Sequence, residues 1–410
     1  MKIAIVTQYF APEAIRIPHT LAQQLSARGH SVRVITGYPN YPDGELFPGY
    51  RQRWNHIETA DGVDVRRVPL FISHSYNPIA RFTNYLSFAA SVAIRGRWVR
   101  SADVVYVYAT QMTPAIGPSI WRRIFSTPYV MHIQDLWPES VTGSSMAGSG
   151  ASKRAIALLL KPWLRSLYRT AAATIAIAPS MANMLQERSV PTDRIHTVFN
   201  WATSEPEAIH RLTKKSDTIS IVYAGNLGDH QDLDTVVRAA NNVKHLHNLR
   251  IVIVGSGVAE KRIRALATEL DAHNVDFRGR VAPEAMVEIH AESDFQLVTL
   301  KDAPIFDGTI PSKLQASLSH GVPVITSVRG DVKNLVRQNQ LGFSCDPESV
   351  SQLSEAFTEA AALSSSSRMM MGETARDFYM KSMSMQSGVD KIESILKTVS
   401  RNSPAQHGWS

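Results

Sequence analysis

The sequence predicts an α/β protein made of two doubly wound, Rossmann-like domains that face a cleft. Short runs rich in Ile and Val alternate with segments of helical periodicity, a pattern typical of parallel sheets covered on both faces. The pattern starts afresh after a polar stretch at 200–218. A chain of 410 residues is also too long for one ordinary hydrophobic core. Two successive βαβ series therefore indicate two domains.

Each expected element follows from its local pattern. In the first half we expect strands at Ile3–Val6, Val32–Ile35, Val104–Val107, Tyr129–Ile133 and Thr174–Ile177, and helices at Pro18–Ala27 and Met181–Arg188. In the second half we expect strands at Ile219–Tyr223, Ile251–Val254, Val275–Arg278, Phe295–Leu300 and Val322–Thr326, helices at Leu233–Leu246 and Ala259–Leu270, and only helix from Val350 to Leu396. The expected domains are 1–200 and 201–375, both Rossmann-like; 376–410 is expected to be a C-terminal helix that can cross back to the first domain, followed by a tail.

Composition restricts the class of protein and its partners. The single cysteine, Cys345, excludes an internal disulfide and indicates a reducing compartment, so we expect a cytoplasmic protein. The apolar start Met1–Val6 is too short for a signal peptide, and no run reaches the ~20 apolar residues of a membrane span. The net charge of +7 favours polyanionic partners. Nucleic acid is the weakest of these, because the chain has no zinc-ligand pattern, helix-turn-helix signature or basic tail.

Two segments have the composition of interfacial helices. Arg81–Arg100 and Lys153–Arg169 interleave large apolar side chains with basic ones. Such helices suit peripheral contact with the anionic inner face of the cytoplasmic membrane. The alternative is a core-packed helix with a solvated basic face, which is common in proteins of this class.

The segment Asp307–Leu314 is the strongest candidate for an anion site. Pro311 suits the first turn of a helix, and Ser312 and Lys313 follow it at once. A helix N-terminus offers unpaired N–H groups and a partial positive charge, so an adjacent lysine makes a phosphate the expected ligand. The alternative is an ordinary loop-to-helix junction with a solvated lysine.

Glycine turns follow three expected strands of the second domain. Gly225, Asn226 and Gly228 end the first strand, Gly255 and Gly257 the second, and Arg278-Gly279 the third. A single turn of this kind is weak evidence, because plain strand-to-helix turns look the same. Together with the Pro311-Ser-Lys turn they line one edge of a sheet with backbone donors. That combination predicts a nucleotide-diphosphate site.

The first domain has a different signature. His132 ends an expected strand that runs into Asp135, Trp137 and Glu139. Carboxylates hydrogen-bond to sugar hydroxyls and an aromatic face stacks on a sugar ring, so Asp135 is the favoured catalytic candidate here. His132 is a weaker acceptor-side candidate, because a buried histidine of this kind is more often a core residue. Glu13 and Arg16 lie in the first loop after a strand and could touch either substrate; the alternative is a solvent-exposed pair.

These motifs resemble a known family. Gln134–Ser140 reads QDLWPES, Tyr223–Gly228 reads YAGNLG, and Ile310–Leu314 reads IPSKL ahead of the run Gly321–Ile325. Over nearly its whole length the chain resembles GT-B fold glycosyltransferases of retaining family 4. The resemblance is closest to the bacterial surface-polysaccharide subgroup that includes the L-fucosamine transferases of O-antigen and capsule synthesis.

The resemblance implies an activity and a set of partners. It implies transfer of a hexosyl or N-acetylhexosaminyl group from a nucleotide sugar, with a UDP-sugar as the expected donor, to a lipid-linked or growing glycan. No metal and no cofactor is implied, because basic side chains and helix dipoles supply the positive charge. Lys313 and Asp135 become the expected catalytic residues. Lys301, Asp307 and Leu314 join the expected donor-binding residues.

The chain also departs from the family. Two positions that carry Arg and Lys in many members are Asn226 and Gln231 here, so Lys301 and Lys313 are the expected replacements. The family's pair of glutamates falls on or next to Gly308 and on Ala316, and Asp307 is the nearest acid. Two alternatives therefore stay open: a nucleotide-sugar epimerase on the same scaffold, and a non-catalytic member of a polysaccharide assembly complex.

Overall fold

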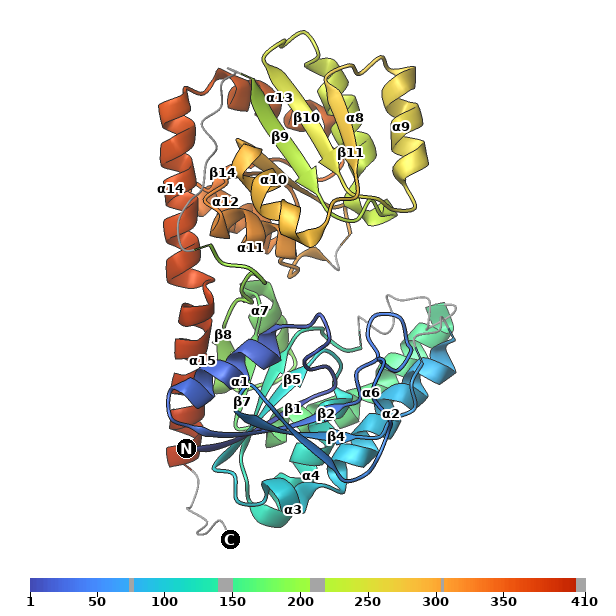
Figure 1. The fold of residues 1–410 in the computed structure, drawn as a ribbon, viewed down its shortest axis with the longest axis vertical. Helices are drawn as coiled ribbons and strands as arrows, with labels where there is room; N and C mark the ends of the chain where they lie inside the picture. The colour runs from blue at the N-terminus through green and yellow to red at the C-terminus, as the bar shows by residue number, and fades with distance from the viewer. Residues whose placement is uncertain (74–76, 139–149, 207–217, 304–305, 403–410) are drawn as a thin grey trace. The chain divides into compact units, whose positions relative to one another are not determined.

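The computed structural model describes residues 1–73, 77–138, 150–206, 218–303 and 306–402. Contacts divide the chain into two compact units (Figure 1). Unit 1 comprises Met1–Phe199 together with the C-terminal segment from Gly388, and unit 2 comprises Asn200–Ser387.

The described part of unit 1 contains an eight-stranded sheet in the order β3-β4-β2-β1-β5-β6-β7-β8. All neighbours pair in parallel except β3 and β4, an antiparallel hairpin that the sequence patterns did not predict. The strands are β1 (Lys2–Thr7), β2 (Ser31–Gly37), β3 (His56–Ala60), β4 (Val63–Val68), β5 (Val104–Ala109), β6 (Tyr129–Ile133), β7 (Ala173–Ala176) and β8 (Ile195–Thr197). The helices are α1 (Ile17–Ala27), α2 (Pro78–Ala93), α3 (Gly96–Val99), α4 (Ile116–Phe125), α6 (Gly150–Thr170) and α7 (Pro179–Glu187).

The segment Arg81–Arg100 is not one helix. It contains most of α2, a break at Ile94 and Arg95, and the short α3. Gly96 follows the break, and a Cβ atom there would lie 2.6 Å from Nε1 of the Trp121 indole. The glycine thus lets the chain pass close to α4, which a continuous helix of larger residues would not allow.

Unit 2 contains a parallel six-stranded sheet in the order β11-β10-β9-β12-β13-β14. Its strands are β9 (Ile219–Ala224), β10 (Leu249–Val254), β11 (Val275–Gly279), β12 (Phe295–Thr299), β13 (Val324–Ser327) and β14 (Gly342–Ser344). Its helices are α8 (Leu233–Asn242), α9 (Glu260–Glu269), α10 (Met286–Glu292), α11 (Ser312–Ser319), α12 (Asp331–Gln338), α13 (Val350–Ala362) and α14 (Ser365–Ser382). Because β9 lies between β10 and β12, the strand order reverses there. Ligands of open α/β sheets bind at such a switch point, beyond the carboxyl ends of the strands.

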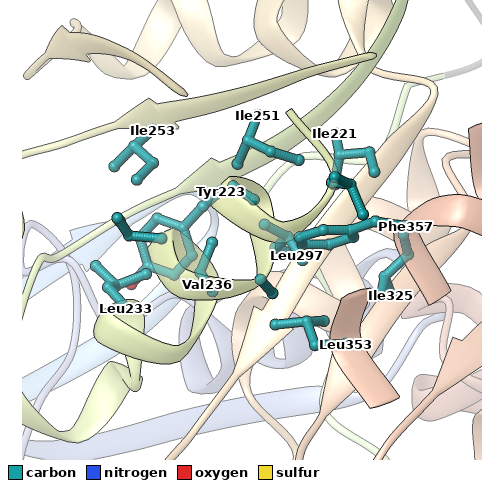
Figure 2. Packing of buried hydrophobic residues seen from close by; sticks show 14 of the residues in the cluster. Ile221, Tyr223, Leu233, Val236, Ile251, Ile253, Leu297, Ile325, Leu353 and Phe357 are labelled. Carbon is teal, nitrogen blue, oxygen red and sulfur yellow. The ribbon is translucent and has the colours of Figure 1, made fainter. Parts of the chain in front are cut away.

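Alternate residues of β9 pack on opposite faces of this sheet. Ile221 and Tyr223 join a cluster with residues of α8, α9 and α13, whereas Val222 and Ala224 pack with Ile289 of α10. Figure 2 shows the Tyr223 ring close to Leu233 and Val236 of α8. The core therefore fixes the end of β9, and with it the turn that follows.

The C-terminal helices belong to different units. In α14, Tyr379 accepts a hydrogen bond from the Ala202 backbone at 3.0 Å, which ties this helix to unit 2. The next helix, α15 (Met385–Arg401), carries Glu393, whose carboxylate accepts hydrogen bonds from Arg28 at 2.8 Å and pairs with His30 at 2.7 Å in unit 1. Among the described residues, no helix is both long and apolar enough to cross a membrane.

Candidate functional site

A cavity of about 900 Å³, here called the α11 cavity, lies in unit 2 beside α11. It is lined by residues from the end of β9, from α10, from the segment after β12 and from α11 itself. They are Trp201, Ala202, Thr203, Ser204, Ala224, Gly225, Asn226, Gln231, Glu284, Met286, Val287, His290, Gln296, Leu300, Phe306, Thr309, Pro311, Ser312, Lys313, Ala316 and His320. The cavity thus occupies the switch point of the sheet.

Lys313 connects the end of β9 to the start of α11. Its ammonium nitrogen donates to the Tyr223 hydroxyl and to Oε1 of Gln231, both at 2.5 Å, and lies 3.9 Å from the centroid of the tyrosine ring. The Tyr223 hydroxyl in turn donates to the Asn226 backbone carbonyl at 2.6 Å. These contacts orient the lysine through neutral groups, so its charge is left for a bound anion to compensate.

Burial also changes the acid–base behaviour of Lys313. Removal from water disfavours the ammonium form and lowers the pKa of Lys313 to about 7. The first N–H groups of α11 lack partners within the helix and point the same way as the helix dipole. Lys313 and the N-terminus of α11 therefore form a site in which the lysine can take up a proton when an anion binds.

The glycine turns after β9 and β10 form a hydrogen-bonded stack. The amide of Gly225 donates to Val254 at 2.9 Å, and the amide of Gly255 donates to Gly279 at 2.7 Å. A Cβ atom at Gly255 would lie 1.9 Å from the Gly225 carbonyl oxygen, and one at Gly257 would lie 2.5 Å from that of Leu227. These glycines are required for close packing of the turns.

The expectation that the turns offer their backbone donors to a ligand is therefore wrong for Gly225 and Gly255. Both amides are already bonded to neighbouring strand ends. Lys313 and the start of α11 line the cavity and carry donors of their own. Gly228, Gly255 and Gly257 shape the loop from outside the lining of the α11 cavity.

The structure brings only some of the expected donor residues together. Gly225, Asn226, Pro311, Ser312 and Lys313 line the α11 cavity. Besides Gly228, Gly255 and Gly257, four expected residues do not. Arg278 is exposed and pairs with Glu292 at 2.6 Å, and Asp307 pairs with Arg329 at 2.5 Å. Leu314 is fully buried in the core, and Lys301 follows the lining residue Leu300 without reaching the cavity.

Of the residues expected to replace missing family residues, only Lys313 is in the site. Lys301 does not share the site with Lys313, and Asp307 does not stand in for the acid missing at Ala316. Ala316 itself lines the cavity and leaves room beside the helix.

The sequence patterns did not predict that Tyr223 contacts Lys313, nor that two histidines line the cavity. Tyr223 lies in the quoted YAGNLG motif, but its role depends on a contact 90 residues along the chain. His290 and His320 also line the cavity, with ring centroids 4.2 Å apart. Nothing in local sequence signals that these two rings meet.

In unit 1, Asp135 lies just beyond the carboxyl end of β6. Its side chain is exposed, yet nearby protein atoms restrict water enough to raise the pKa of the carboxyl. His132, inside β6, is fully buried, and its Nδ1 lies 2.5 Å from the Tyr106 hydroxyl. Burial lowers the pKa of His132 to about 3. His132 is thus a neutral core residue, and the interpretation of it as an acceptor-binding group is wrong.

The other acceptor-side candidates have structural partners or lie at the surface. Trp137 is buried between Tyr85 and Trp163, with both centroid distances at 6.2 Å. Glu13 is buried, and its carboxylate accepts backbone hydrogen bonds from Phe10, Asn40 and Tyr41 at 2.9–3.0 Å, so it organises a loop. Arg16 is exposed. Glu139 lies outside the described residues.

Comparison with known families gives one match for each half of the chain. Residues 15–201 match the model described as glycosyl transferase 4-like domain, and residues 204–378 match the model described as glycosyl transferases group 1. The putative colanic acid biosynthesis glycosyl transferase WcaI of Escherichia coli K12 is 25% identical over 390 residues, which cover 88% of this chain and 93% of that protein.

Solved structures share the fold at low sequence identity. A glycosyltransferase from Rickettsia africae matches with a TM-score of 0.68 and 15% identity over 98% of this chain and 99% of its own. Anabaena Alr3699/HepE, solved in complex with UDP and glucose, matches with a TM-score of 0.63 and 14% identity over 97% of this chain and all of its own. At such identities the likeness shows the fold alone.

Proposed function

We propose that this chain, a GT-B fold glycosyltransferase with a 4-like domain followed by a group 1 domain, moves a sugar from a nucleotide sugar to a glycan acceptor. The observation that carries the proposal is the convergence of Lys313, the N-terminus of α11 and the Gly225 turn on one cavity. That arrangement suits a diphosphate. The complexes of Anabaena HepE with UDP support the same donor class, since the fold is shared.

The proposed role of unit 2 is to stabilise the leaving diphosphate. As the bond between the anomeric carbon and the phosphate oxygen breaks, its electron pair passes to the diphosphate. Lys313 and the α11 amides would lower the energy of that charge, which grows in the transition state. Because their positions are set before reaction, little reorganisation is needed.

The proposed stereochemistry is retention. The acceptor oxygen would attack the anomeric carbon on the face that the diphosphate leaves, and its proton would pass to the departing phosphate oxygen. Asp135 is the proposed acceptor-side residue, since its exposed carboxylate lies at a strand end where it can accept a hydrogen bond from a sugar hydroxyl. No metal is assigned a role in this scheme.

The proposed acceptor is a lipid-linked or growing glycan of a cell-surface polysaccharide. The relation to WcaI, whose name refers to colanic acid biosynthesis, supports this pathway class. The sugar is proposed to be a hexosyl or N-acetylhexosaminyl group carried by UDP, on the basis of the motif resemblance along both halves of the chain. A cytoplasmic site of action is part of the same proposal.

Exposed apolar and cationic side chains of unit 1 support the proposal that the chain contacts an anionic membrane. On α2, Ile79, Phe82 and Leu86 repeat at helical spacing and are exposed, at 77%, 42% and 43%. On α6, Leu158 and Leu159 are 69% and 78% exposed. Exposed cationic residues accompany them on α6: Arg154, Lys161 and Arg165. Apolar side chains beside cations are typical of an interfacial helix.

A two-stage assay with the purified full-length chain tests the proposal. Thermal shift against UDP-, GDP- and dTDP-sugars should identify a donor that raises the melting temperature. That donor should then be consumed only when a lipid-linked glycan is present, and NMR of the product should show the donor's anomeric configuration. Conversion of the donor to an epimer without acceptor would favour the epimerase instead. Absence of all nucleotide-sugar binding would favour a non-catalytic role.

A further inference from the structure

A second cavity, of about 910 Å³, lies in unit 1 and is here called the α15 cavity. Its lining comes from the ends of α4 and α6, the segments that lead into β6 and β7, the edge strand β8 and one face of α15. The cavity therefore lies at the amino ends of β6 and β7. Its size is typical of a small-molecule site.

The α15 cavity is separate from the proposed acceptor-side residue. Asp135 follows the carboxyl end of β6, whereas Pro128, which lines the α15 cavity, precedes the amino end of the same strand. The five residues of β6 extend over about 16 Å. A ligand of the α15 cavity would thus bind at the opposite end of the sheet from Asp135.

Basic side chains dominate the charge of the α15 cavity. The described lining contains four cationic residues and one acidic residue, Asp193, which leaves a formal charge of +3. The four are Arg122, Arg169, Arg194 and Lys391. The last three are exposed, and none of them forms an ion pair within the described part of the chain. An anionic ligand would therefore meet positive charge that the protein does not compensate.

Neighbouring groups leave this charge in place. His196 lines the cavity, but burial lowers its pKa, so the ring is neutral at physiological pH. Asp390 and Glu393 of α15 are not in the lining, and their carboxylates pair with Arg28 at 2.7 and 2.8 Å. The positive charge of the α15 cavity is thus available to a ligand.

Stabilisation of helix ends explains only part of this cluster. Arg122 lies in the last turn of α4, where its guanidinium donates to the Ser126 carbonyl at 2.8 Å, and Arg169 lies in the last turn of α6. A cation is favourable at such an end. Lys391, by contrast, lies near the start of α15, and Arg194 lies in the short turn before β8, so neither gains from a helix dipole. Binding of an anion accounts for all four.

One face of α15 adds groups that can bond to hydroxyls. Four polar residues at its turns are spaced three or four apart and all line the cavity: Lys391, Ser394, Thr398 and Asn402. The Thr398 hydroxyl donates to the Ser394 carbonyl at 3.0 Å and keeps its lone pairs for a hydroxyl of a ligand. Ile395 lies between them in the lining and suits the C–H groups of a sugar ring.

We propose that the α15 cavity binds a soluble phosphorylated sugar. Its phosphate would contact the cationic residues, since guanidinium groups bind phosphate oxygens in pairs. Its hydroxyls would bond to the polar face of α15. The described lining contains no Phe, Tyr or Trp ring on which a base could stack, which favours a sugar phosphate over a nucleotide. The site requires neither the α11 cavity nor the proposed transfer reaction.

Calorimetric titration with glucose 6-phosphate, inorganic phosphate and glucose tests this assignment. The full-length Lys313→Met variant is used, so that the α11 cavity does not contribute. Glucose 6-phosphate should bind more tightly than either of the other two probes. Arg194→Gln with Lys391→Gln should weaken its binding by about tenfold or more, through loss of two charged contacts. Ser394→Ala should weaken glucose 6-phosphate by about threefold and leave inorganic phosphate unchanged.

Arg97→Gln with Arg100→Gln is the matched control. Both residues are exposed in unit 1 and lie outside the lining of the α15 cavity, and the double change removes the same two charges. This control should change the affinity for glucose 6-phosphate by less than about twofold, because distant exposed charges are screened by salt. Arg194→Lys with Lys391→Arg keeps both charges and should retain most of the affinity.

Several outcomes would overturn the assignment. Absence of glucose 6-phosphate binding would do so, as would equal losses in the two double glutamine variants, which would mean that net charge alone governs binding. Equal losses of glucose 6-phosphate and inorganic phosphate in Ser394→Ala would remove the sugar from the face of α15. Phosphatidic acid vesicles supply a lipid-bound phosphate, and binding of these vesicles without binding of glucose 6-phosphate would rule out a soluble ligand. Should the double glutamine variant unfold, its two single variants decide by the same comparison.

Discussion

Lys313 donates a hydrogen bond of 2.5 Å to the hydroxyl of Tyr223, and this contact joins the start of α11 to the end of β9. Tyr223 belongs to the buried core of unit 2, so the position of its hydroxyl is set by the packing of the sheet. The lysine consequently depends on the core for its orientation. A carboxylate in the place of this hydroxyl would instead neutralise the charge that a diphosphate needs.

Replacement of Lys313 should remove donor binding. We expect Lys313→Met to weaken UDP binding by more than about tenfold, the loss typical of a charge-assisted hydrogen bond. Sugar transfer should fall further, because charge on the leaving group increases in the transition state. Titration calorimetry and a UDP-release assay measure the two effects. Lys301→Met is the control, since Lys301 lies outside the cavity lining; an equal loss in both variants would refute the assignment.

UDP affinity should depend on the protonation of Lys313. Its pKa is about 7 in the free protein because burial disfavours the ammonium, and a bound diphosphate should raise that pKa. The complex then holds more protons than the free protein above pH 7. Affinity should therefore be highest below pH 7 and fall by up to about tenfold per pH unit above it.

Titrations from pH 6 to 9 in buffers of different ionisation enthalpy measure this proton uptake directly. Lys313→Met should lose the uptake above pH 7. A wild-type affinity that stays level from pH 7 to 9 would contradict the prediction.

Gly225 should be required for the position of the Lys313 side chain as well as for the turn after β9. A Cβ atom at Gly225 would lie 2.6 Å from Cε of Lys313, and the residue has φ +142°. We expect Gly225→Ala to displace the lysine and abolish UDP binding, with a backbone strain of about 1–3 kcal/mol. Urea unfolding and calorimetry separate the two effects.

Gly279→Ala is the matched control for this variant. Gly279 also has a positive φ, of +70°, but a Cβ atom there would meet no other atom within 4 Å among the described residues. This variant should lose about 1–2 kcal/mol of stability and keep its UDP affinity. Equal affinity in the two variants would mean that Gly225 acts only on the backbone.

Much of the fold was predictable from local patterns. Most parallel strands of both sheets are short apolar runs, and a buried strand shows the same apolar pattern wherever it lies. The edge strands β8 and β14 were not expected, because each has only three half-buried residues and no apolar run. The hairpin β3–β4 was missed because β3 alternates between half-buried and exposed residues without a strong apolar face, and three charged residues interrupt the apolar pattern of the mostly buried β4. The break before Gly96 depends on Trp121, 25 residues away, so no local periodicity reveals it.

The site was predictable only where its residues are contiguous. Pro311, Ser312 and Lys313 form one motif at a helix start, and they do line the cavity. Lys301 and Asp307 were expected beside this motif because of their charge and their position in the sequence. Neither property predicts the direction of a side chain. Asp307 pairs instead with Arg329, a partner that the sequence does not indicate. His290 of α10 and His320 at the end of α11 lie 30 residues apart in the sequence and meet only in the folded chain.

Asp135 should affect transfer and not donor binding. It lies in unit 1 at the end of β6, and its proposed partner is an acceptor hydroxyl. We expect Asp135→Asn to lower the turnover number by about 10²-fold or more, in line with loss of a positioned polar group, while UDP affinity stays unchanged. Steady-state kinetics and UDP titration measure the two. A normal turnover number would remove Asp135 from the site, and a parallel loss of UDP affinity would contradict an acceptor-side role.

The exposed leucines of α6 should control membrane association. Leu158 and Leu159 are 69% and 78% exposed beside cationic residues, so they can enter a lipid surface without leaving a core. We expect Leu158→Glu with Leu159→Glu to reduce binding to anionic liposomes more than about tenfold, since each change removes an apolar contact and adds a repelled charge. Binding of the wild-type chain should decrease as salt is raised.

Vesicle co-sedimentation measures this binding, and α14 of unit 2 offers a matched control. Met369 and Met370 are also consecutive, apolar and exposed, at 50% and 61%. Met369→Glu with Met370→Glu adds the same two negative charges and lowers the net charge from +7 to +5. This control should therefore weaken liposome binding only through the change in net charge. Equal losses in the two double variants would show that net charge governs association and that α6 has no special role. Salt-independent binding of the wild-type chain would argue against an electrostatic contribution, and no binding at all would mean that these leucines serve another purpose than lipid contact.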